Sequence, residues 1–276
     1  MAAKTDNPAL VRTAVDVRGL GQPGGSVHGM TDDVVAQETP VAMVYNGISH
    51  AVMLASPADL EDFALGFSLT EGIIESPGEL YDLEVEQAPE GLSVSMRISN
   101  ERFAVLKAQR RNMTGRTGCG LCGTESLEQA IRPIKLLRAG VVVSDAAIQR
   151  AVQSLRNHQP LQAETGATHG AAWCNLAGDI LAVREDVGRH NALDKLIGFQ
   201  LRTGSDLQQG FALISSRASF EMVQKSAAVG IGCLVAVSAP TALAVAQARK
   251  AGLMLVGFAR PNRHVIYHPG EASGSS

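Results

Sequence analysis

Residues 211–260 read FALISSRASFEMVQKSAAVGIGCLVAVSAPTALAVAQARKAGLMLVGFAR, and this stretch decides the fold. Three short apolar runs are separated by two stretches of helical length. Strands that alternate with helices of about 10 to 15 residues are typical of a partly parallel sheet that helices cover on both faces. The predicted order is strand 211–215, helix 219–230, strand 233–237, helix 241–251 and strand 253–258.

The segment before this stretch extends the same domain. Ser144 or Asp145 is suited to cap a helix, because a short polar side chain can accept a hydrogen bond from the first turn. The predicted elements are a helix at 146–157, paired strands at 167–174 and 180–183, and a helix at 187–201. We therefore expect one α/β domain over residues 126–269.

Residues 29–111 predict a smaller α+β lobe. Asn46-Gly47 is the strongest hairpin signal in the chain, because both residues tolerate positive φ. Ser56 followed by Pro57 is suited to begin a helix. The predicted elements are strands 41–45 and 48–54, a helix from 56 to 71, strands 80–87 and 92–98, and a helix at 102–111. The lobe is thus of the ββαββ type, and the fold class is α/β in the larger domain and α+β overall.

The two ends of the chain, residues 1–28 and 270–276, are rich in Gly and small polar residues and predict a flexible leader and a flexible tail. The N-terminus lacks the apolar core of a signal peptide. The longest uncharged run, 226–248, contains Pro240 and is better explained by a strand followed by a helix than by a membrane span. We expect a cytoplasmic protein that does not bind membranes.

The charge balance argues against a nucleic-acid-binding protein. Lys and Arg total 24 and Asp and Glu total 27, which gives a net charge of −3. Aromatic residues make up only 4%, so platforms for base stacking are few. A local basic pocket is still compatible with this composition.

The sharpest chemical feature is a glycine-rich loop at 112–125, which contains Gly118-Cys119-Gly120-Leu121-Cys122-Gly123. Such a loop is suited to movement. Arg110, Arg111 and Arg116 precede the cysteines and favour the thiolate form. A mobile, electropositive thiol is suited to attack a donor persulfide and to deliver the outer sulfur elsewhere. Two ordinary surface cysteines are the alternative.

Two other chemistries use a C-x-x-C motif. A zinc site normally needs a second close pair of ligands, and only His264 and His268 have such a spacing, in a stretch that is predicted to be extended. Cys174 and Cys233 stand alone in apolar segments. A thioredoxin-like redox site would place the motif at a strand-to-helix turn early in a βαβ unit, whereas here it lies in mid-chain.

The stretch 184–195, REDVGRHNALDK, carries a second group of candidates. At about 100° per residue, His190 shares an apolar helix stripe with Leu193 and Ile197. It is either a core histidine or part of a pocket wall. Arg189 and Lys195 are expected to point away from the stripe, toward solvent.

Ser215, Arg217 and Ser219 lie where a strand meets a helix N-terminus, a place that suits a phosphate. An ordinary strand–helix junction is the alternative. Glu221 and Lys225 are spaced as a surface ion pair within one helix. His169, in a strand of small residues, is predicted to be either buried or close to a ligand.

The turn after the last strand, Phe258-Ala259-Arg260-Pro261-Asn262-Arg263, follows the carboxyl end of that strand. Ligands gather at this edge in open α/β sheets. Two arginines and an asparagine are suited to hold a pyrophosphate or a guanine edge. A polar turn without a ligand is the alternative.

These segments together resemble the FdhD family, the accessory sulfurtransferases of formate dehydrogenase. The match rests on TGCGxCG at 117–123, which contains Cys119 and Cys122, on TGxxH ending at His169 and on EDVGRHNAxDK at 185–195. It also rests on SxRxSxEMVxK at 215–225 and GFxR at 257–260. Order and spacing agree from about residue 40 to 268.

The resemblance implies a sulfur carrier whose persulfide forms on Cys119, with Cys122 as its helper. An IscS-type cysteine desulfurase supplies the sulfur, and the client is the molybdenum cofactor, a bis(molybdopterin guanine dinucleotide), before its insertion into formate dehydrogenase. The family's cofactor-binding stretch maps to Phe258 through Arg263. The resemblance also implies a cytidine-deaminase-like C-terminal domain and a homodimer. No tightly bound metal of its own is expected.

The reading of the residues and the resemblance agree on an anionic ligand at several loops. The full set of candidate ligand-binding residues is His169, Arg189, His190, Ser215, Arg217, Ser219, Phe258, Ala259, Arg260, Pro261, Asn262 and Arg263. Arg184 and Lys225 are further candidate cations for this pocket.

Two alternatives differ in class. A zinc-dependent hydrolase of the deaminase type needs H-x-E with P-C-x-x-C. Gly170 and Ala171 follow His169, so this glutamate is missing, and Thr117-Gly118 replaces the proline. In a non-catalytic cofactor-binding chaperone, the cysteines would only position the cofactor.

Overall fold

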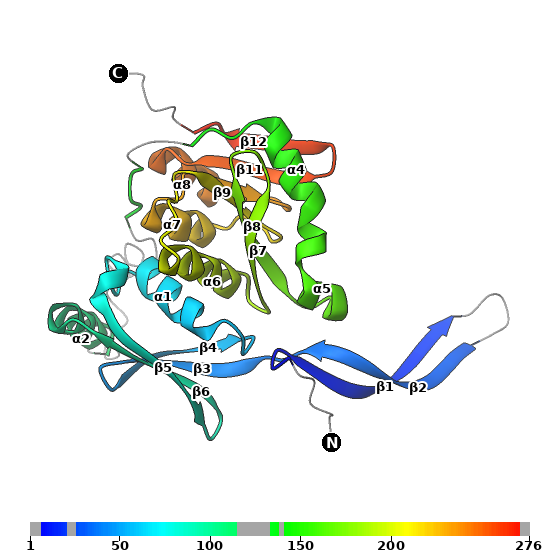
Figure 1. The fold of residues 1–276 in the computed structure, drawn as a ribbon, viewed down its shortest axis with the longest axis horizontal. Helices are drawn as coiled ribbons and strands as arrows, with labels where there is room; N and C mark the ends of the chain where they lie inside the picture. The colour runs from blue at the N-terminus through cyan, green and yellow to red at the C-terminus, as the bar shows by residue number, and fades with distance from the viewer. Residues whose placement is uncertain (1–6, 21–25, 115–132, 138–140, 271–276) are drawn as a thin grey trace, which may run out of the picture.

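The computed structural model describes residues 7–20, 26–114, 133–137 and 141–270. Cys119, Cys122 and most of the 112–125 loop lie outside the described residues, as do residues 271–276 of the predicted tail. Figure 1 shows an α/β domain above a smaller sheet, with a two-stranded ribbon that extends to one side. Within the described residues the strands form three sheets.

The larger domain is built on a six-stranded sheet in the order β12-β11-β10-β9-β7-β8. Its three central strands, β9, β10 and β11, are parallel, whereas β7, β8 and β12 join antiparallel to their neighbours. The bounds are β7 His169–Asn175, β8 Ile180–Asp186, β9 Gly210–Ile214, β10 Cys233–Ala236, β11 Met254–Arg260 and β12 Arg263–His268. The predicted strand and helix order of residues 211–260 is confirmed.

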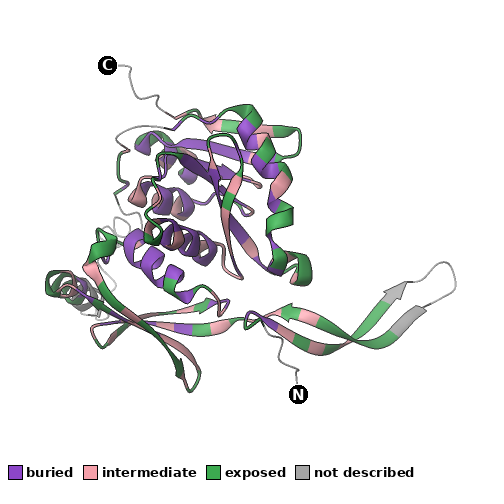
Figure 2. Ribbon diagram, viewed as in Figure 1, coloured by how far each residue is buried: buried purple, intermediate pink, exposed green. Residues whose placement is uncertain are grey.

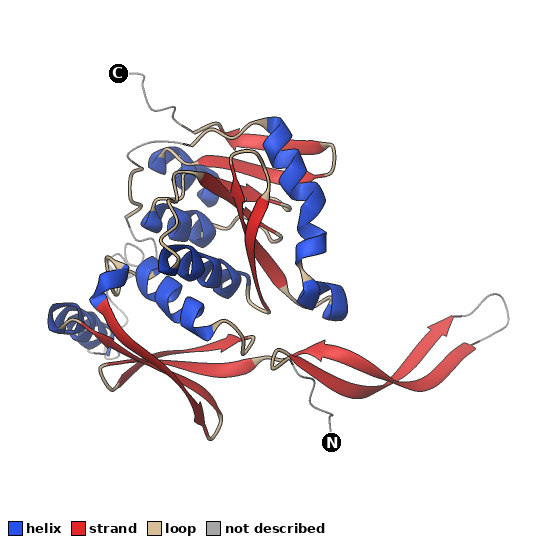
Figure 3. Cartoon of the chain, in the orientation of Figure 1, coloured by secondary structure: helices blue, strands red, loops and turns tan. Residues whose placement is uncertain are grey.

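Helices cover both faces of this sheet (Figure 3). Alternate residues of β9 face opposite layers: Ala212 and Ile214 pack with α6, α7 and α8, whereas Phe211 and Leu213 pack with α4. Strands buried on both faces read as continuous apolar runs, which explains the pattern in the sequence. The helices are α4 Asp145–Leu155, α5 Pro160–Thr165, α6 Arg189–Arg202, α7 Phe220–Val229 and α8 Ala242–Ala251, with a short 3₁₀ turn at Arg156–His158.

Helix α4 begins where the sequence predicted. The Ser144 hydroxyl accepts a hydrogen bond from the Ala147 N–H at 3.2 Å, so Ser144 is the cap. Thr241 caps α8 in the same way. Helix α5 was not predicted, because a six-residue helix carries too little periodicity to be recognised.

The smaller lobe has the predicted ββαββ order. Its sheet runs β4-β3-β6-β5 and packs one face on helix α1. Asn46 and Gly47 have φ of 46° and 80° and form the predicted hairpin turn. The bounds are β3 Thr39–Tyr45, β4 Ile48–Ala55, α1 Leu60–Thr70, a 3₁₀ turn Pro77–Glu79, β5 Leu80–Ala88, β6 Gly91–Ile98 and α2 Asn100–Thr114.

Two expectations for the N-terminal part are wrong. Ser56 does not cap α1, which begins at Leu60; the Ser56 backbone is buried and bonded to the larger domain instead. Residues 10–20, expected in a loose, flexible leader, form the regular strand β1 (Leu10–Leu20), which pairs antiparallel with β2 (Ser26–Ala36). Alternate β-branched residues along β1, such as Val11, Thr13 and Val15, favour this ribbon. Figure 2 shows that most of it is exposed.

The two lobes meet where α1 crosses α6. A Cβ on Gly66 would overlap the carbonyl oxygen of Asp194, and a Cβ on Gly198 would overlap that of Asp62. Both clashes are with backbone atoms, which cannot rotate away. The two glycines therefore set the close approach of the helices.

Replacing Gly198 by alanine is expected to lower the free energy of unfolding by about 1 to 3 kcal/mol, because the added methyl group forces the helices apart. Chemical denaturation monitored by circular dichroism measures this. Gly204, where an added Cβ meets nothing within 4 Å but φ is 70°, provides a comparison in which only backbone strain acts. Equal losses at the two sites would contradict the packing argument.

Candidate functional site

The carboxyl ends of β9, β10 and β11 meet at one edge of the six-stranded sheet. Strand β7 runs antiparallel to β9, so its first residue, His169, lies at this same edge. Strand β8 runs antiparallel to β7, so its last residue, Asp186, lies opposite His169. The N-termini of α6 and α7 follow directly. Ligands of open α/β sheets bind at such an edge.

Three connecting segments are bonded side by side along this edge. The Ser215 N–H donates to the Gly170 carbonyl and the Gly170 N–H donates to the Ser215 hydroxyl, both at 2.9 Å. The Ser238 N–H donates to the Ser216 carbonyl at 3.3 Å, and the Phe258 N–H donates to the Ser238 carbonyl at 3.0 Å. The structure thus brings Ser215, the start of β7 and Phe258 into one row.

Two histidines and an arginine form the electrostatic centre of the site. Burial lowers the pKa of His169, and the charge of Arg189 lowers it further against the opposing effect of Asp186. Burial and Arg189 also lower the pKa of His190, together with Lys225 and against Glu221. Both imidazoles are therefore neutral at neutral pH, and Arg189 is the residue of this centre that carries a positive charge there.

Two nitrogen atoms of this centre lack a hydrogen-bond partner in the described part of the chain. They are Nε of Arg189 and Nε2 of His190, both buried. The His190 side chain as a whole is 31% exposed. Buried polar atoms are nearly always bonded in folded proteins, so the unpaired Nε–H of Arg189 at a ligand edge fits a ligand that carries acceptor oxygens.

The N-terminus of α7 carries its own carboxylate. The Ser219 hydroxyl donates to Oε2 of Glu221 at 2.6 Å, and the same oxygen lies 3.7 Å from Nε2 of His190. Burial raises the pKa of Glu221, but the bonds from Ser219 and from its own backbone and the charges of His190 and Arg189 outweigh burial and lower it. Arg217, in the same junction, is exposed.

The turn at 258–263 lies partly apart from this centre. Phe258 has a φ of 49°, a strained conformation for a bulky residue of the kind found at functional sites. Ala259 is fully buried in the layer under α4, and the Asn262 N–H donates to Oε1 of Gln149 in that helix at 2.7 Å. Arg260, Pro261 and Arg263 are exposed. A ligand that spans the edge from Arg189 would reach these side chains only at its far end.

Three cations expected in the ligand pocket or in solvent are instead part of the contact between the lobes. Lys195 was expected to be solvated, but it is fully buried and 2.7 Å from Asp186. Arg184 pairs with Asp62 at 2.8 Å and stacks on Phe199. Lys225 was expected to pair with Glu221, but it bonds Asp194 and Glu71. Each of these carboxylate partners lies outside the element of its cation, so helical spacing alone could not reveal it.

Asp186 holds the turn that carries Arg189 and His190. Its carboxylate accepts from Ser56 N–H at 2.9 Å, from Gly188 N–H at 2.8 Å and from the Asn191 amide at 2.9 Å, besides its contact with Lys195. Lys195 also donates to the Ser56 carbonyl at 2.9 Å. We call these five residues, Ser56, Asp186, Gly188, Asn191 and Lys195, the Asp186 network. It fixes the start of α6 to the smaller lobe.

The two cysteines that the structure describes are poor candidates for thiol chemistry. Cys174 in β7 and Cys233 in β10 are fully buried in the apolar layer under α4. Burial raises the pKa of both thiols well above its ordinary range. The predictions for Cys119 and Cys122 concern residues outside the described ones and stay predictions.

Among the described residues there is no group of three or more His, Cys, Asp or Glu side chains that could hold a metal ion. Likewise, no helix within the described ranges is long and apolar enough to cross a membrane.

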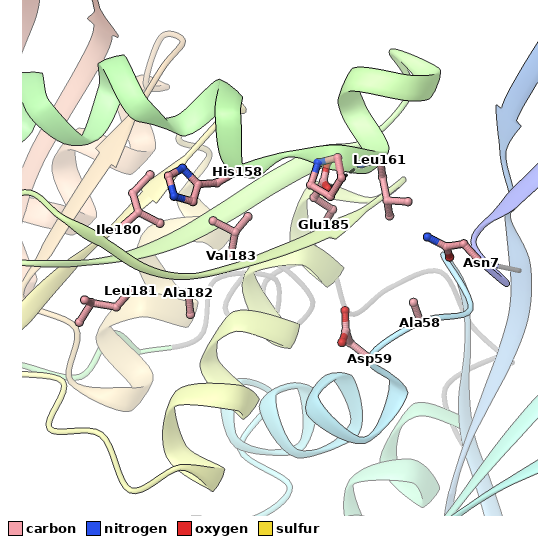
Figure 4. A pocket seen from close by; sticks show the side chains of 11 residues that line it. Asn7, Ala58, Asp59, His158, Leu161, Ile180, Leu181, Ala182, Val183 and Glu185 are labelled. Carbon is pink, nitrogen blue, oxygen red and sulfur yellow. Dashed lines mark hydrogen bonds between the residues drawn. The ribbon is translucent and has the colours of Figure 1, made fainter.

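A pocket of about 440 Å³ lies along β8 between α5 and the start of α1 (Figure 4). Its lining includes Asp59, His158 and Glu185, and none of the predicted ligand residues. The Glu185 carboxylate is bonded to the N–H groups of Leu161 and Gln162 at the start of α5, at 2.9 and 2.8 Å. The pocket thus adjoins the carboxyl edge at Glu185, which pairs with Gly170 of β7 and directly precedes Asp186.

Comparison with known proteins covers most of the chain. The model of the FdhD/NarQ family matches residues 36–273. The chain is 55% identical over 241 residues to the sulfur carrier protein FdhD of Cupriavidus necator. The aligned residues make up 87% of this chain and 84% of the Cupriavidus protein. It is 52% identical over 266 residues to the sulfur carrier protein FdhD of Bordetella petrii, with 95% and 96% covered.

A solved structure is also similar. The crystal structure of a formate dehydrogenase accessory protein from Desulfotalea psychrophila superposes with a TM-score of 0.70 at 26% identity, over 95% of this chain and 97% of that one. The family match, the two relatives and this structure agree over nearly the same residues. The resemblance seen in the motifs is thereby confirmed, and the chain belongs to the FdhD/NarQ family.

Proposed function

We propose that this chain is a sulfurtransferase that carries sulfur on Cys119 from a cysteine desulfurase of the IscS type to the molybdenum cofactor of formate dehydrogenase. The observation that carries the proposal is the division of the four cysteines. Cys174 and Cys233 are fully buried thiols with raised pKa values. Sulfur exchange requires a thiolate, and it therefore falls to the C-x-x-C pair. The similarity to relatives that are sulfur carrier proteins supports this assignment.

The proposed chemistry has two steps. The Cys119 thiolate attacks the outer sulfur of the desulfurase persulfide; a new S–S bond forms on Cys119, the donor S–S bond breaks, and the desulfurase cysteine leaves as a thiolate. Cys122 then attacks the inner sulfur of the Cys119 persulfide, which forms a Cys119–Cys122 disulfide and releases hydrosulfide to the client. The two cysteines supply the two electrons, and a cellular dithiol reduces the disulfide afterwards.

The client is proposed to bind at the carboxyl edge. A bis(molybdopterin guanine dinucleotide) carries two pyrophosphates, so its site should offer cations and unpaired donors. Arg189, His190 and His169 are together at this edge, with Ser215, Arg217 and Ser219 beside them; Phe258 through Arg263 are proposed to contact the far end. We further propose a cytidine-deaminase-like fold for the larger domain, a cytoplasmic location, a homodimer, and formate dehydrogenase apoenzyme as the receiver of the loaded cofactor.

The proposal is tested by incubating the full chain with a cysteine desulfurase and cysteine and measuring its intact mass. The expected result is a gain of one sulfur atom that a thiol reductant removes. A mass that stays unchanged, while a known persulfide acceptor is loaded in the same mixture, would overturn the proposal.

Binding of the client's charged portion is expected to depend on pH. His169 and His190 have lowered pKa values and are neutral at neutral pH. On acidification each gains a positive charge, so the affinity for pyrophosphate should rise as the pH falls below about 6.5, the ordinary pKa of histidine. Calorimetric titration measures this, with His264→Gln as a control, because His264 lies in β12, where it bonds Gln149 and Asp145. An affinity that is flat or falls with acidification would contradict a role for these histidines.

A further inference from the structure

Helices α6 and α7 touch through two polar contacts that are one helical turn apart. His190 and Asp194 lie four residues apart on α6, and Glu221 and Lys225 have the same spacing on α7. His190 faces Glu221 at 3.7 Å, at the ligand edge, and Asp194 faces Lys225 at 2.8 Å, one turn deeper. Residues four apart lie on the same helix face, so both contacts are on one line.

The deeper contact is buried and fully bonded. The side chains of Asp194 and Lys225 are 1% and 8% exposed. The Lys225 ammonium donates to both carboxylate oxygens of Asp194, at 3.0 and 2.8 Å. A buried ion pair of this geometry has one arrangement, because moving either partner leaves a charge without compensation.

The same ammonium also reaches the smaller lobe. It donates to Thr70 Oγ1 at 3.0 Å and to Glu71 Oε1 at 2.9 Å, at the end of α1. Thr70 in turn donates to Asp194 at 2.7 Å. Three helices from two lobes therefore meet at one side chain, directly beneath the contact between His190 and Glu221.

We propose that Asp194 and Lys225 are positioning residues of the ligand site, whose ion pair sets the separation of α6 and α7 and thereby holds His190 against Glu221. Neither residue touches the ligand in this arrangement. The inference rests on the proposed function only for the identity of the ligand.

The test is a double-mutant cycle read on the His190 ring by NMR titration of the full chain, with His190→Gln used to assign the signal. The charged groups around this ring are Arg189 on its own helix and Glu221 and Lys225 on α7. Glu221→Gln removes the carboxylate that raises the His190 pKa, so the pKa should fall. In a Lys225→Met background this fall should shrink, because Glu221 is no longer held against the ring. Because the fall caused by Glu221→Gln is measured both with and without Lys225, the direct effect of the Lys225 charge on the His190 pKa cancels from the comparison.

Arg202→Met is the matched control. Arg202 joins α6 to α1 at the far end of α6, through Asp62 at 2.7 Å, and Asp62 retains Arg184 when Arg202 is lost. In this background Glu221→Gln should lower the His190 pKa as much as in the parent chain. If Lys225→Met does not fold, Asp194→Asn with Lys225→Met removes both charges together and is used in its place.

A second readout is affinity for pyrophosphate. Lys225→Met should weaken binding by about fivefold, Lys225→Arg should restore most of it, and Arg202→Met should not change it. An equal fall of the His190 pKa in the parent and Lys225→Met backgrounds would overturn the inference. The titration needs neither ligand nor sulfur, so an absence of pyrophosphate binding by the parent chain would count against the proposed client site alone.

Discussion

Cys119→Ala is expected to abolish sulfur loading and to lower the activity of co-expressed formate dehydrogenase by roughly a hundredfold or more, as loss of a covalent nucleophile does elsewhere. The reason is that no other thiol in the proposed scheme can attack the donor persulfide. Activity of the dehydrogenase in extracts, with its protein level measured in parallel, gives the effect.

The other cysteines supply the controls. Cys122→Ala should still load sulfur but should release it slowly, because the resolving thiolate is missing. Cys174→Ala should load and deliver sulfur normally and should lose about 1 kcal/mol of stability from its buried position under α4. Normal dehydrogenase activity with Cys119→Ala would contradict the sulfur-carrier account and favour a cofactor-binding chaperone.

Binding of the client separates these two functions further. The cations of the carboxyl edge lie in the described part of the chain and do not depend on the cysteine side chains. Cys119→Ala should therefore bind pyrophosphate with the affinity of the parent chain. A variant that loses both sulfur loading and anion binding would indicate misfolding instead of the loss of one thiol.

Lys195→Met is expected to cause the largest loss of stability, about 3–5 kcal/mol. Lys195 and Asp186 are both fully buried, and removing the ammonium leaves Asp186 as an uncompensated charge between the lobes. Denaturant unfolding measures the loss. Lys195→Met should also weaken anion binding, because the Asp186 network holds the start of α6, where Arg189 and His190 lie.

Two variants show whether the effect belongs to the buried pair. Asp186→Asn with Lys195→Met removes both charges and should be less destabilised than Lys195→Met alone. Lys250→Met, at an exposed position of α8, should change stability by no more than about 0.5 kcal/mol. A loss for Lys195→Met as small as that for Lys250→Met would contradict the role of the network.

Local patterns predicted most of the elements, for reasons that are visible in particular residues. The three parallel strands were recognisable because both faces of each are covered, so that Phe211 to Ile214 are all apolar. Asn46-Gly47 predicted a hairpin because its backbone conformation is required by the turn itself. Ser144 predicted a helix start because its hydroxyl satisfies an N–H three residues away.

The errors concern residues whose partners are distant in sequence. Ser56 has the composition of a helix cap, yet its backbone N–H is bonded to Asp186, 130 residues away. Lys195 lies on the polar side of α6 by spacing, and only the approach of the smaller lobe buries it. Contacts of this kind depend on tertiary packing, which overrides local propensity.

The candidate site was predicted in part. His169, Arg189, His190 and the junction at Ser215 do lie at one edge, because the carboxyl ends of parallel strands must meet there. Glu221 was expected on the surface as a partner of Lys225. The structure places it against His190, a contact between two helices that neither helix reveals alone.

The most direct test of the account is to locate the sulfur. The full chain is loaded by a cysteine desulfurase, its persulfides are trapped by alkylation, and the digested peptides are analysed by mass spectrometry. The account predicts an additional sulfur on the peptide that contains Cys119. Sulfur on the peptides of Cys174 or Cys233, or its absence from all four cysteines, would contradict it.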